Sequence, residues 1–358
     1  MRPHIRSVAA ATAVVVLCVA IVVVVYRSSV SARPPVVRSR VEGLLGRTCQ
    51  ITAVAADPAT DVPPEALAQA EGRIRRIEWQ ISLYSDSGCV AQFNHAPANK
   101  PVPAEPEALT LLRISREVHR GSRGAFDPTI YPAVLLWRQA RKAHRSPSEA
   151  ELAAVMKRVG IERLKAGPAD LTKLVEGVQV DMGNIVHGFA ADEAADVLRP
   201  MKLGGACVRI GQDTRCFGRG EHGAAWEVGI LHPFSDRTCG TLGLTDAAVS
   251  SRGESSRQFE IIGKRYSNLV NPRTGKSVEE LPAVTVVCLG SPDRPASAAR
   301  AEAWATALHV LGPAGLPLLQ KDGPFEAVII TGSASACQIH KTKGFDALLA
   351  PGTKLNLE

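Results

Sequence analysis

The sequence lacks the signatures of several common functional sites. Its eight cysteines include no CxxC pair and no Cys/His cluster at zinc spacing, which argues against a structural metal site or a thioredoxin-like redox motif. No GxGxxG follows a strand pattern and opens a helix, so a Rossmann-type dinucleotide site is a poor match. The basic residues are scattered, without the aromatic-basic interleaving that follows a nucleic-acid backbone. We therefore expect no nucleic-acid partner.

Charged residues are also few. They make up 22% of the 358 residues, whereas hydrophobic residues make up 45%, a composition far from that of disordered chains. A chain of this length buries a substantial core, as one large domain or two ordinary ones. The net charge of +7 is spread along the chain, and we interpret it as a contribution to solubility.

The N-terminal segment carries no charge over Ser7–Tyr26, a length that can cross a bilayer as a helix. We interpret residues 1–27 as a membrane anchor or signal segment. Val30–Ala32 resembles a small-residue cleavage site, but the apolar run is longer than that of a usual signal peptide, which favours an uncleaved anchor. The arginines that follow the run would, by the positive-inside rule, hold the main domain in the cytoplasm.

The rest of the chain divides into a linker and one folded unit. Residues 28–40 are rich in Ser, Arg and Pro, which predicts a linker, and the folded unit then spans residues 41–358. Apolar spacing and capping residues predict helices after Pro64, over Glu105–Val118, from Ser146 to Gly160, over Phe189–Leu198 and over Ala296–Leu311. β-rich runs predict strands at Val178–Asp181, Cys207–Ile210, Trp226–Leu231, Gln258–Ile262 and Val284–Leu289, with a hairpin turn at Gly263. This mixture indicates a single α+β domain.

Cys207 and Cys216 flank a short stretch that can form a hairpin. A disulfide between them is one interpretation if the domain lies in an oxidising compartment. A pair of buried thiols is the other, because cysteine often packs as a small apolar residue.

Five short segments follow one another over most of the chain. They are ISLYSDS at 81–87 with Phe93-Asn94 after it, GAFDPT at 124–129 with Trp137 after it, DMGNIVHGFAAD at 181–192, YSNLVNPRTG at 266–275 and AEAWATAL at 301–308. Each segment is weak alone. Their order and spacing resemble the signature of the ApbE family, whose members are FAD:protein FMN transferases.

The resemblance implies an ApbE-type fold and an enzyme that attaches FMN from FAD to a Ser or Thr of an acceptor flavoprotein and releases AMP. It also implies an exported, membrane-anchored main domain on the periplasmic side and a membrane-associated acceptor, and we give this more weight than the arginine pattern. The residues that it assigns to FAD binding are Ala125, Phe126, Asp127, His187, Asp192, Ser251, Arg252, Asn268 and Leu269.

The second and third segments offer physical reasons for such a role. Gly124, Asp127 and Pro128 are typical of a tight turn. The run from Asp181 indicates a strand that ends in a Gly-rich turn and opens a helix. Backbone N–H groups and the positive end of the helix dipole then face a phosphate group.

The fifth segment places Glu302 and Thr306 four residues apart, on one side of a predicted helix. The resemblance implies that they and the backbone carbonyl of Val186 hold Mg2+, or Mn2+ or another divalent ion, against the FAD pyrophosphate. Mg2+ requires a tight octahedral arrangement, and Glu302 is one methylene longer than the aspartate of the family. The alternative is an exposed glutamate and a core-facing threonine on an amphipathic helix.

Several residues of the expected pocket depart from the family pattern. His187 stands for a lysine, Asn268 for a histidine, and Arg252 is inserted into a Thr-Ser-Gly turn. Asp181 and His187 are candidates for accepting the proton of the acceptor hydroxyl, by position alone. The changes leave two alternatives to the transferase open: a flavin-binding scaffold, and an FAD pyrophosphatase that uses water in place of the acceptor.

Overall fold

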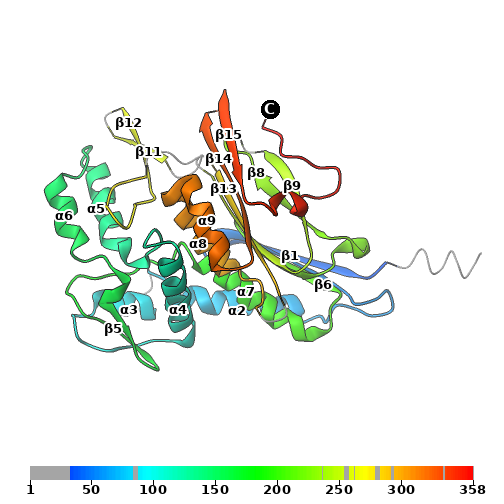
Figure 1. Ribbon diagram of the computed structural model, residues 1–358. Coiled ribbons are helices and arrows are strands. Elements are labelled where there is room, and N and C mark those ends of the chain that lie inside the picture. Colours follow the sequence, from blue (N-terminus) through cyan, green and yellow to red (C-terminus); the bar gives the residue numbers. More distant parts are fainter. Residues whose placement is uncertain are drawn as a thin grey trace, which may run out of the picture.

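The computed structural model describes residues 33–83, 88–235, 237–253, 258–261, 263–278, 283–291, 294–333 and 335–357 (Figure 1). The expected anchor at residues 1–27, the Val30–Ala32 motif and residues 84–87 of the first segment lie outside this part. Within it, none of the helices combines the length and the hydropathy that crossing a bilayer requires.

An eight-stranded antiparallel sheet forms the centre of the fold. In spatial order its strands are β1 (Val36–Leu44), β2 (Arg47–Val54), β6 (Gly205–Ile210), β7 (Asp213–Gly218), β10 (Ala247–Gly253), β13 (Ala283–Leu289), β14 (Phe325–Ser333) and β15 (Ala336–Lys341). β1 corrects the linker expected at residues 28–40, because residues 36–40 already pair in register with β2. The β-branched Val36, Val37 and Val41 favour this extended conformation.

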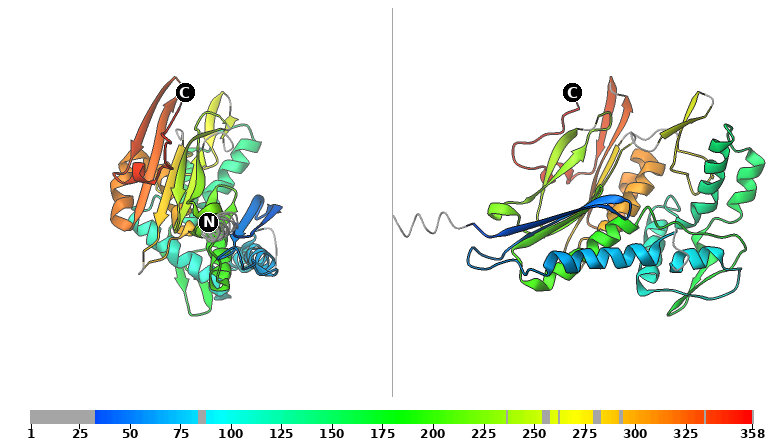
Figure 2. Two further views of the ribbon diagram at one scale, coloured as in Figure 1. Left: turned by 90° about the vertical axis from the view of Figure 1, so that its right-hand side faces the viewer. Right: turned by 180° about the vertical axis from the view of Figure 1, so that it is seen from behind.

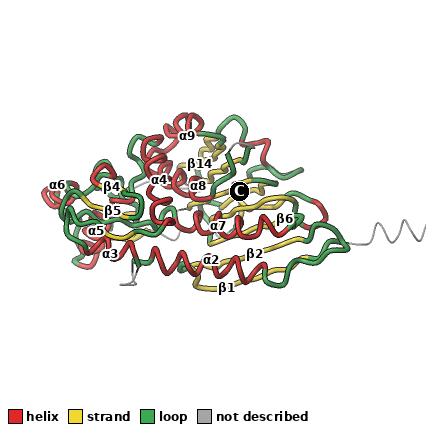
Figure 3. Tube along the Cα trace, turned by 90° about the horizontal axis from the view of Figure 1, so that it is seen from below, coloured by secondary structure: helices red, strands yellow, loops and turns green. Residues whose placement is uncertain are grey.

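Four helices lie side by side over one face of the sheet (Figure 3). They are α2 (Ala66–Ile81), α7 (Val186–Leu198), α8 (Ala298–Leu311) and α9 (Leu316–Asp322). α2 packs against β1, α7 against β6 and β7, α8 against β10 and β13, and α9 against β14. The other face of the sheet is covered by the hairpin of β8 (Trp226–Leu231) and β9 (Thr238–Leu244).

A more helical part lies beside this core, on the left in Figure 1 and on the right in the rear view of Figure 2. It contains α3 (Cys89–His95), α4 (Pro106–Gly121), α5 (Tyr131–Lys142), α6 (Glu149–Met156), β3 (Val102–Pro103), β4 (Leu164–Ala166), β5 (Asp170–Lys173) and the hairpin of β11 (Gln258–Ile261) and β12 (Lys264–Ser267). Short 3-10 helices occur at η1 (Pro128–Ile130), η2 (Ile161–Arg163), η3 (Arg199–Met201), η4 (Glu221–Gly223), η5 (Gly312–Gly315) and η6 (Phe345–Leu348). The β11–β12 hairpin packs on α5 through Trp137, Phe259 and Tyr266.

The close approach of α7 and α8 positions the site described below. A Cβ atom at Gly188 on α7 would lie 2.2 Å from the carbonyl oxygen of Ala298, at the start of α8. The alanines of α8 on either side of the buried Trp304 keep this helix slim where it packs. Glycine at position 188 is therefore required by the contact between two backbones, because any side chain would push the helices apart.

Most of the expected elements are confirmed, with two corrections. The helices predicted after Pro64, over Glu105–Val118, over Phe189–Leu198 and over Ala296–Leu311 are α2, α4, α7 and α8. The strand predicted at Val178–Asp181 is wrong: these residues belong to no strand. The helix predicted from Ser146 to Gly160 begins later and ends at Met156, because Ser148 and Glu151 form the capping box.

Cys207 and Cys216 are directly opposed in the β6–β7 ladder as free thiols. Burial raises the pKa of Cys207 to about 11 and that of Cys216 to about 12. Of the two interpretations of this pair, the structure shows free thiols, with Cys216 buried and Cys207 partly buried.

Candidate functional site

Four ionisable side chains from four elements meet between the helical layer and the sheet. They are His187 on α7, Asp213 on β7, Arg252 on β10 and Glu302 on α8. Potential ligand atoms of His187, Asp213 and Glu302 all lie within 4.8 Å of one another. We call these four residues the charge cluster. Glu302 has no exposed side-chain surface, and only 9% of the Arg252 side chain is exposed.

Both carboxylate oxygens of Glu302 have donors from the chain itself. Oε1 accepts from Nη2 of Arg252 at 2.9 Å and lies 3.1 Å from Nδ1 of His187. Oε2 accepts from the backbone N–H of Gly188 at 2.8 Å. Arg252 also donates from Nη1 to Oδ1 of Asn184 at 3.2 Å. The cluster is therefore a hydrogen-bonded network, which is what a buried charge needs to be stable.

The ionisation states follow from burial and from these neighbours. Burial raises the pKa of Glu302, but His187 and Arg252 outweigh it, so the net pKa lies below its ordinary value. Burial lowers the pKa of His187, and the Glu302 carboxylate more than compensates, so the net pKa is raised. Burial and the charge of Glu302 raise the pKa of Asp213 to about 7. The ionised form of Glu302 and the protonated form of His187 thus favour each other.

A cavity of about 380 Å³ adjoins the cluster. It lies between the β1–β2 turn, the C-terminal end of α2 and the turn that opens α7, and its lining includes Glu78, Asp181, Gly183, Val186 and His187. The structure therefore brings the two predicted catalytic residues, Asp181 and His187, to one cavity. Its volume is within the range of small-molecule sites.

The turn at the mouth of α7 is held by Asp181. Its Oδ1 accepts from the N–H of Gly183 at 2.7 Å, and its own N–H donates to the carbonyl of Pro128 at 2.9 Å. The N-terminal end of α7, at Val186 and His187, consequently faces the cavity, where the positive end of the helix dipole favours an anion. The expected Gly-rich turn into a helix is confirmed here, without the strand that we expected before it.

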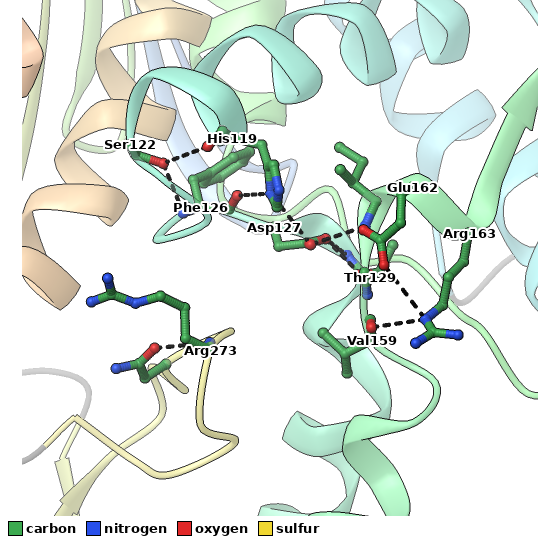
Figure 4. Close-up of polar contacts among 12 residues, drawn as sticks. His119, Ser122, Phe126, Asp127, Thr129, Val159, Glu162, Arg163 and Arg273 are labelled. Atoms are coloured by element: carbon green, nitrogen blue, oxygen red, sulfur yellow. Dashed lines mark hydrogen bonds and ion pairs between the residues drawn. The ribbon is translucent and has the colours of Figure 1, made fainter.

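The GAFDPT segment forms a buried turn (Figure 4). Asp127 accepts at Oδ1 from the N–H and the hydroxyl of Thr129, at 2.8 and 2.6 Å, and at Oδ2 from the N–H of Ile161. Ala125 and Phe126 are 0% and 2% exposed. In this structure the side chains of all three predicted FAD-binding residues are buried in the loop and shape it.

His119 supports the same turn and was missed by the sequence reasoning. Its Nδ1 lies 3.0 Å from the carbonyl of Phe126 and 3.4 Å from Oδ2 of Asp127 (Figure 4). Burial raises the pKa of Asp127, with opposing contributions from Thr129 and His119. The available signal was its place in the last turn of α4, immediately before the loop.

Two other predicted FAD-binding residues have structural roles. Asp192 accepts hydrogen bonds from the hydroxyl of Ser297 and from the N–H groups of Ala298 and Ala299, so it caps the N-terminus of α8. Ser251 shares a hydrogen bond of 2.9 Å with Thr285. Because side chains alternate along β10, Ser251 faces the β8–β9 side of the sheet, away from Arg252.

Asn268 and Leu269 lie beyond β12, in the loop that carries the fourth segment. Asn268 is exposed and Leu269 is half-buried. The indole of Trp137 donates to the carbonyl of Gly275 at 2.8 Å, which fixes this loop on α5. A Cβ atom at Gly124 would lie 3.9 Å from Cγ of Arg273, and Figure 4 shows Arg273 beside the GAFDPT turn. The second and fourth segments are therefore neighbours, but no described contact joins Asn268 or Leu269 to the charge cluster.

The expected metal ligands do not form an open coordination set. Thr306 donates its hydroxyl hydrogen to the carbonyl of Glu302 at 3.0 Å, and both carboxylate oxygens of Glu302 are engaged as described. A divalent ion on Glu302 would lie beside the guanidinium of Arg252. At about 4 Å and an effective dielectric constant of about 20, a divalent and a monovalent cation repel by about 8 kcal/mol. Val186, Glu302 and Thr306 therefore do not fit the ion that the resemblance implied.

Comparisons with known proteins agree with this architecture. A sequence model of the ApbE family matches residues 45–329. The chain is 26% identical over 280 residues to an FAD:protein FMN transferase of Klebsiella pneumoniae, covering 75% of this chain and 77% of that one. It is 28% identical over 292 residues to an FAD:protein FMN transferase of Treponema pallidum, covering 76% and 78%.

The fold has solved relatives as well. The apo form of the Pseudomonas stutzeri flavinyl transferase ApbE superposes with a TM-score of 0.76 at 27% identity, covering 89% of this chain and 98% of that one. The family match extends from the β1–β2 turn into β14, so it includes the cavity, the charge cluster and all five segments. The chain belongs to the ApbE family.

Proposed function

We propose that the protein is an FAD:protein FMN transferase, which transfers FMN from FAD to a Ser or Thr hydroxyl of an acceptor protein. The observation that carries the proposal is the cavity at the N-terminus of α7, lined by Asp181 and His187 and backed by the charge cluster. Membership of the ApbE family and the names of its relatives supply the substrate.

The reaction exchanges the phosphoanhydride bond between the FMN and AMP halves of FAD for a phosphoester bond to the acceptor. The hydroxyl oxygen of the acceptor attacks the phosphorus of the FMN half of FAD, and the bond from that phosphorus to the bridging oxygen breaks. AMP leaves with the bridging oxygen. The hydroxyl proton passes to a base, and the negative charge that builds on the phosphate oxygens needs fixed positive groups nearby.

We assign these tasks to the two predicted catalytic residues. The Glu302 carboxylate raises the pKa of His187, which favours the protonated ring and suits it to donating toward phosphate oxygens. Asp181, at the turn into α7, remains the group for accepting the hydroxyl proton. The N-terminus of α7 adds its dipole to the same side of the cavity. No step is assigned to Mg2+ or Mn2+, because Val186, Glu302 and Thr306 do not fit either ion.

The proposal is tested by incubating the purified protein with FAD and a candidate acceptor flavoprotein. AMP is measured by chromatography and the acceptor by covalent flavin fluorescence after denaturation. AMP together with a flavinylated acceptor supports the transferase. AMP without a labelled acceptor at any acceptor concentration would replace it by the pyrophosphatase.

A flavin-binding scaffold is the second candidate. It is favoured by Asn268, which stands where the family has a histidine, and by the engagement of both oxygens of Glu302. In the same experiment, FAD binding without AMP release would support the scaffold. An absence of FAD binding would contradict both candidates.

The location of the protein is a proposal of its own. The uncharged run Ser7–Tyr26 supports a membrane anchor, with the main domain on the extracytoplasmic side beside a membrane-associated acceptor. Protease treatment of intact spheroplasts tests this arrangement. Digestion of the main domain is expected, and protection until the cells are lysed would place the domain in the cytoplasm.

A further inference from the structure

The side chain of Arg252 has a donor that the fold leaves unused. It is nearly buried, and its Nε is enclosed without a hydrogen-bond partner among the described residues. Buried donors are almost always paired, and an unpaired N–H on a charged group indicates a missing acceptor. Nη2 of the same guanidinium donates to Glu302, and Nη1 donates to Asn184. Glu302 and Asn184 therefore hold Arg252 in place through Nη2 and Nη1, and its Nε–H has no acceptor among the described residues.

The position of Arg252 follows from the strand that carries it. Ser250 and Arg252 lie on the same face of β10, and the hydroxyl of Ser250 donates to Asp213 at 2.6 Å. That face is turned to α8 and to the turn that opens α7. The inserted residue thus brings its cation to the carboxylate of Glu302, where an incoming divalent ion would otherwise bind.

We propose that the guanidinium of Arg252 replaces the divalent cation of this site and makes FAD binding independent of metal ions. The inference rests on the proposed function for the identity of the anion, the pyrophosphate of FAD. The replacement itself rests on the geometry of Glu302 and Arg252.

The charges of the cluster are consistent with this replacement. Arg252 and His187 already face the carboxylates of Glu302 and Asp213 within one buried network. A divalent ion would add two positive charges beside the buried cation of Arg252. A planar guanidinium, in contrast, can hold a carboxylate with one edge and present further N–H groups to phosphate oxygens with another.

The first test measures the metal directly and needs no flavin. Mn2+ is titrated into the purified protein and free Mn2+ is followed by electron paramagnetic resonance. The wild type is expected to bind no Mn2+ at this site. The variant Arg252→Ala removes the guanidinium from Oε1 of Glu302, and we expect its affinity for Mn2+ to rise at least tenfold. Stoichiometric Mn2+ binding by the wild type, removed by Glu302→Gln, would overturn the proposal.

The second test measures FAD affinity by quenching of flavin fluorescence, in EDTA and in Mg2+. The wild type is expected to give dissociation constants within twofold of each other. Arg252→Ala should lose at least tenfold in EDTA and recover part of the loss in Mg2+, whereas Arg252→Lys should keep its independence of metal. A wild type that binds FAD at least tenfold more tightly in Mg2+ than in EDTA would overturn the proposal.

Arg113→Ala is the matched control, because Arg113 is an exposed arginine on α4. It should behave as the wild type in both titrations. If Arg252→Ala fails to fold, the wild-type measurements still test the proposal. The expected Mn2+ binding and the expected FAD affinities of the wild type do not depend on the variant. If no protein binds FAD, the proposed function fails, while the Mn2+ titration still reports on the charge replacement.

Discussion

Arg252 donates to Glu302 over 2.9 Å, from β10 to α8, at a point where Glu302 has no contact with solvent. A buried ion pair is not by itself a source of stability, because both groups give up their hydration. Removing one partner is another matter, since the remaining charge is then buried and unpaired. The relationship therefore predicts how the protein responds when the pair is broken.

Glu302→Ala should be strongly destabilising. It leaves Arg252 and His187 without their shared acceptor, and breaking a buried pair in this way typically lowers the free energy of unfolding by about 3–5 kcal/mol. Urea denaturation followed by circular dichroism measures the change. Glu149→Ala, which removes an exposed carboxylate paired with Lys276, is the control and should leave stability unchanged. An equal loss in both variants would mean that the cluster has no special energetic role.

The contribution of His187 to stability should depend on pH. The pKa of His187 is raised above its ordinary value of 6.5 in the folded protein, so the folded state binds the proton more tightly than the unfolded chain. Its contribution is therefore complete below the unfolded pKa and is lost as the pH rises through the folded one. Comparing the wild type with His187→Gln by thermal unfolding, we expect the difference to be largest in mild acid and to shrink in alkali. A difference that grows with pH would mean that His187 is buried as a neutral ring.

Asp181→Asn should impair chemistry more than binding. Asp181 is proposed to accept the proton of the acceptor hydroxyl, and loss of a general base typically slows a reaction by about 10²- to 10⁴-fold. AMP release should fall by this factor while the dissociation constant of FAD stays within a few fold. Asp196→Asn, on the exposed side of α7, is the control. Unchanged AMP release by Asp181→Asn would assign the base to another residue.

Gly188→Ala should separate α7 from α8. The new Cβ would lie 2.2 Å from the carbonyl oxygen of Ala298, and overpacking of this kind lowers stability by about 1–3 kcal/mol or more. Gly72→Ala tests the same substitution in α2, where a Cβ meets nothing within 4 Å. There the change should stabilise the helix by about 0.5–1 kcal/mol. Chemical denaturation of both variants measures the two effects, and a stable Gly188→Ala would show that the helices can move apart freely.

The helices were the most predictable part of the fold. Ala70, Ile74, Ile77 and Ile81 recur at helical spacing, and all four are buried on one side of α2. The run Val178–Asp181 was predicted to be a strand because its composition favours an extended conformation. Composition does not show whether a partner strand lies beside it, and here the run belongs to no strand. Asn94 instead fixes Val180 through its side-chain amide, a contact between residues 86 positions apart that no local pattern shows.

The candidate site was predictable in part. The order of the five segments identified the family and brought Asp181, His187 and Glu302 into consideration. Arg252 was found by comparing a further turn with the family pattern. The roles of these residues could not be predicted. A match to a family motif indicates where a residue lies, but it does not indicate which residues a substituted side chain contacts there. Asp192 turned out to cap α8, and Ser251 faces the opposite side of the sheet.

By itself the sequence determined the family, the mixed architecture and the periodic helices, since these depend on local spacing and on the order of motifs. Only the tertiary structure decided that Asp213 lies with His187, Arg252 and Glu302. It also decided that the carboxylate of Glu302 contacts the guanidinium of Arg252 and the imidazole of His187. The physical reason is that burial and Coulomb interactions depend on distances in space, and these four residues come from separate elements that only the folded sheet and helices bring together.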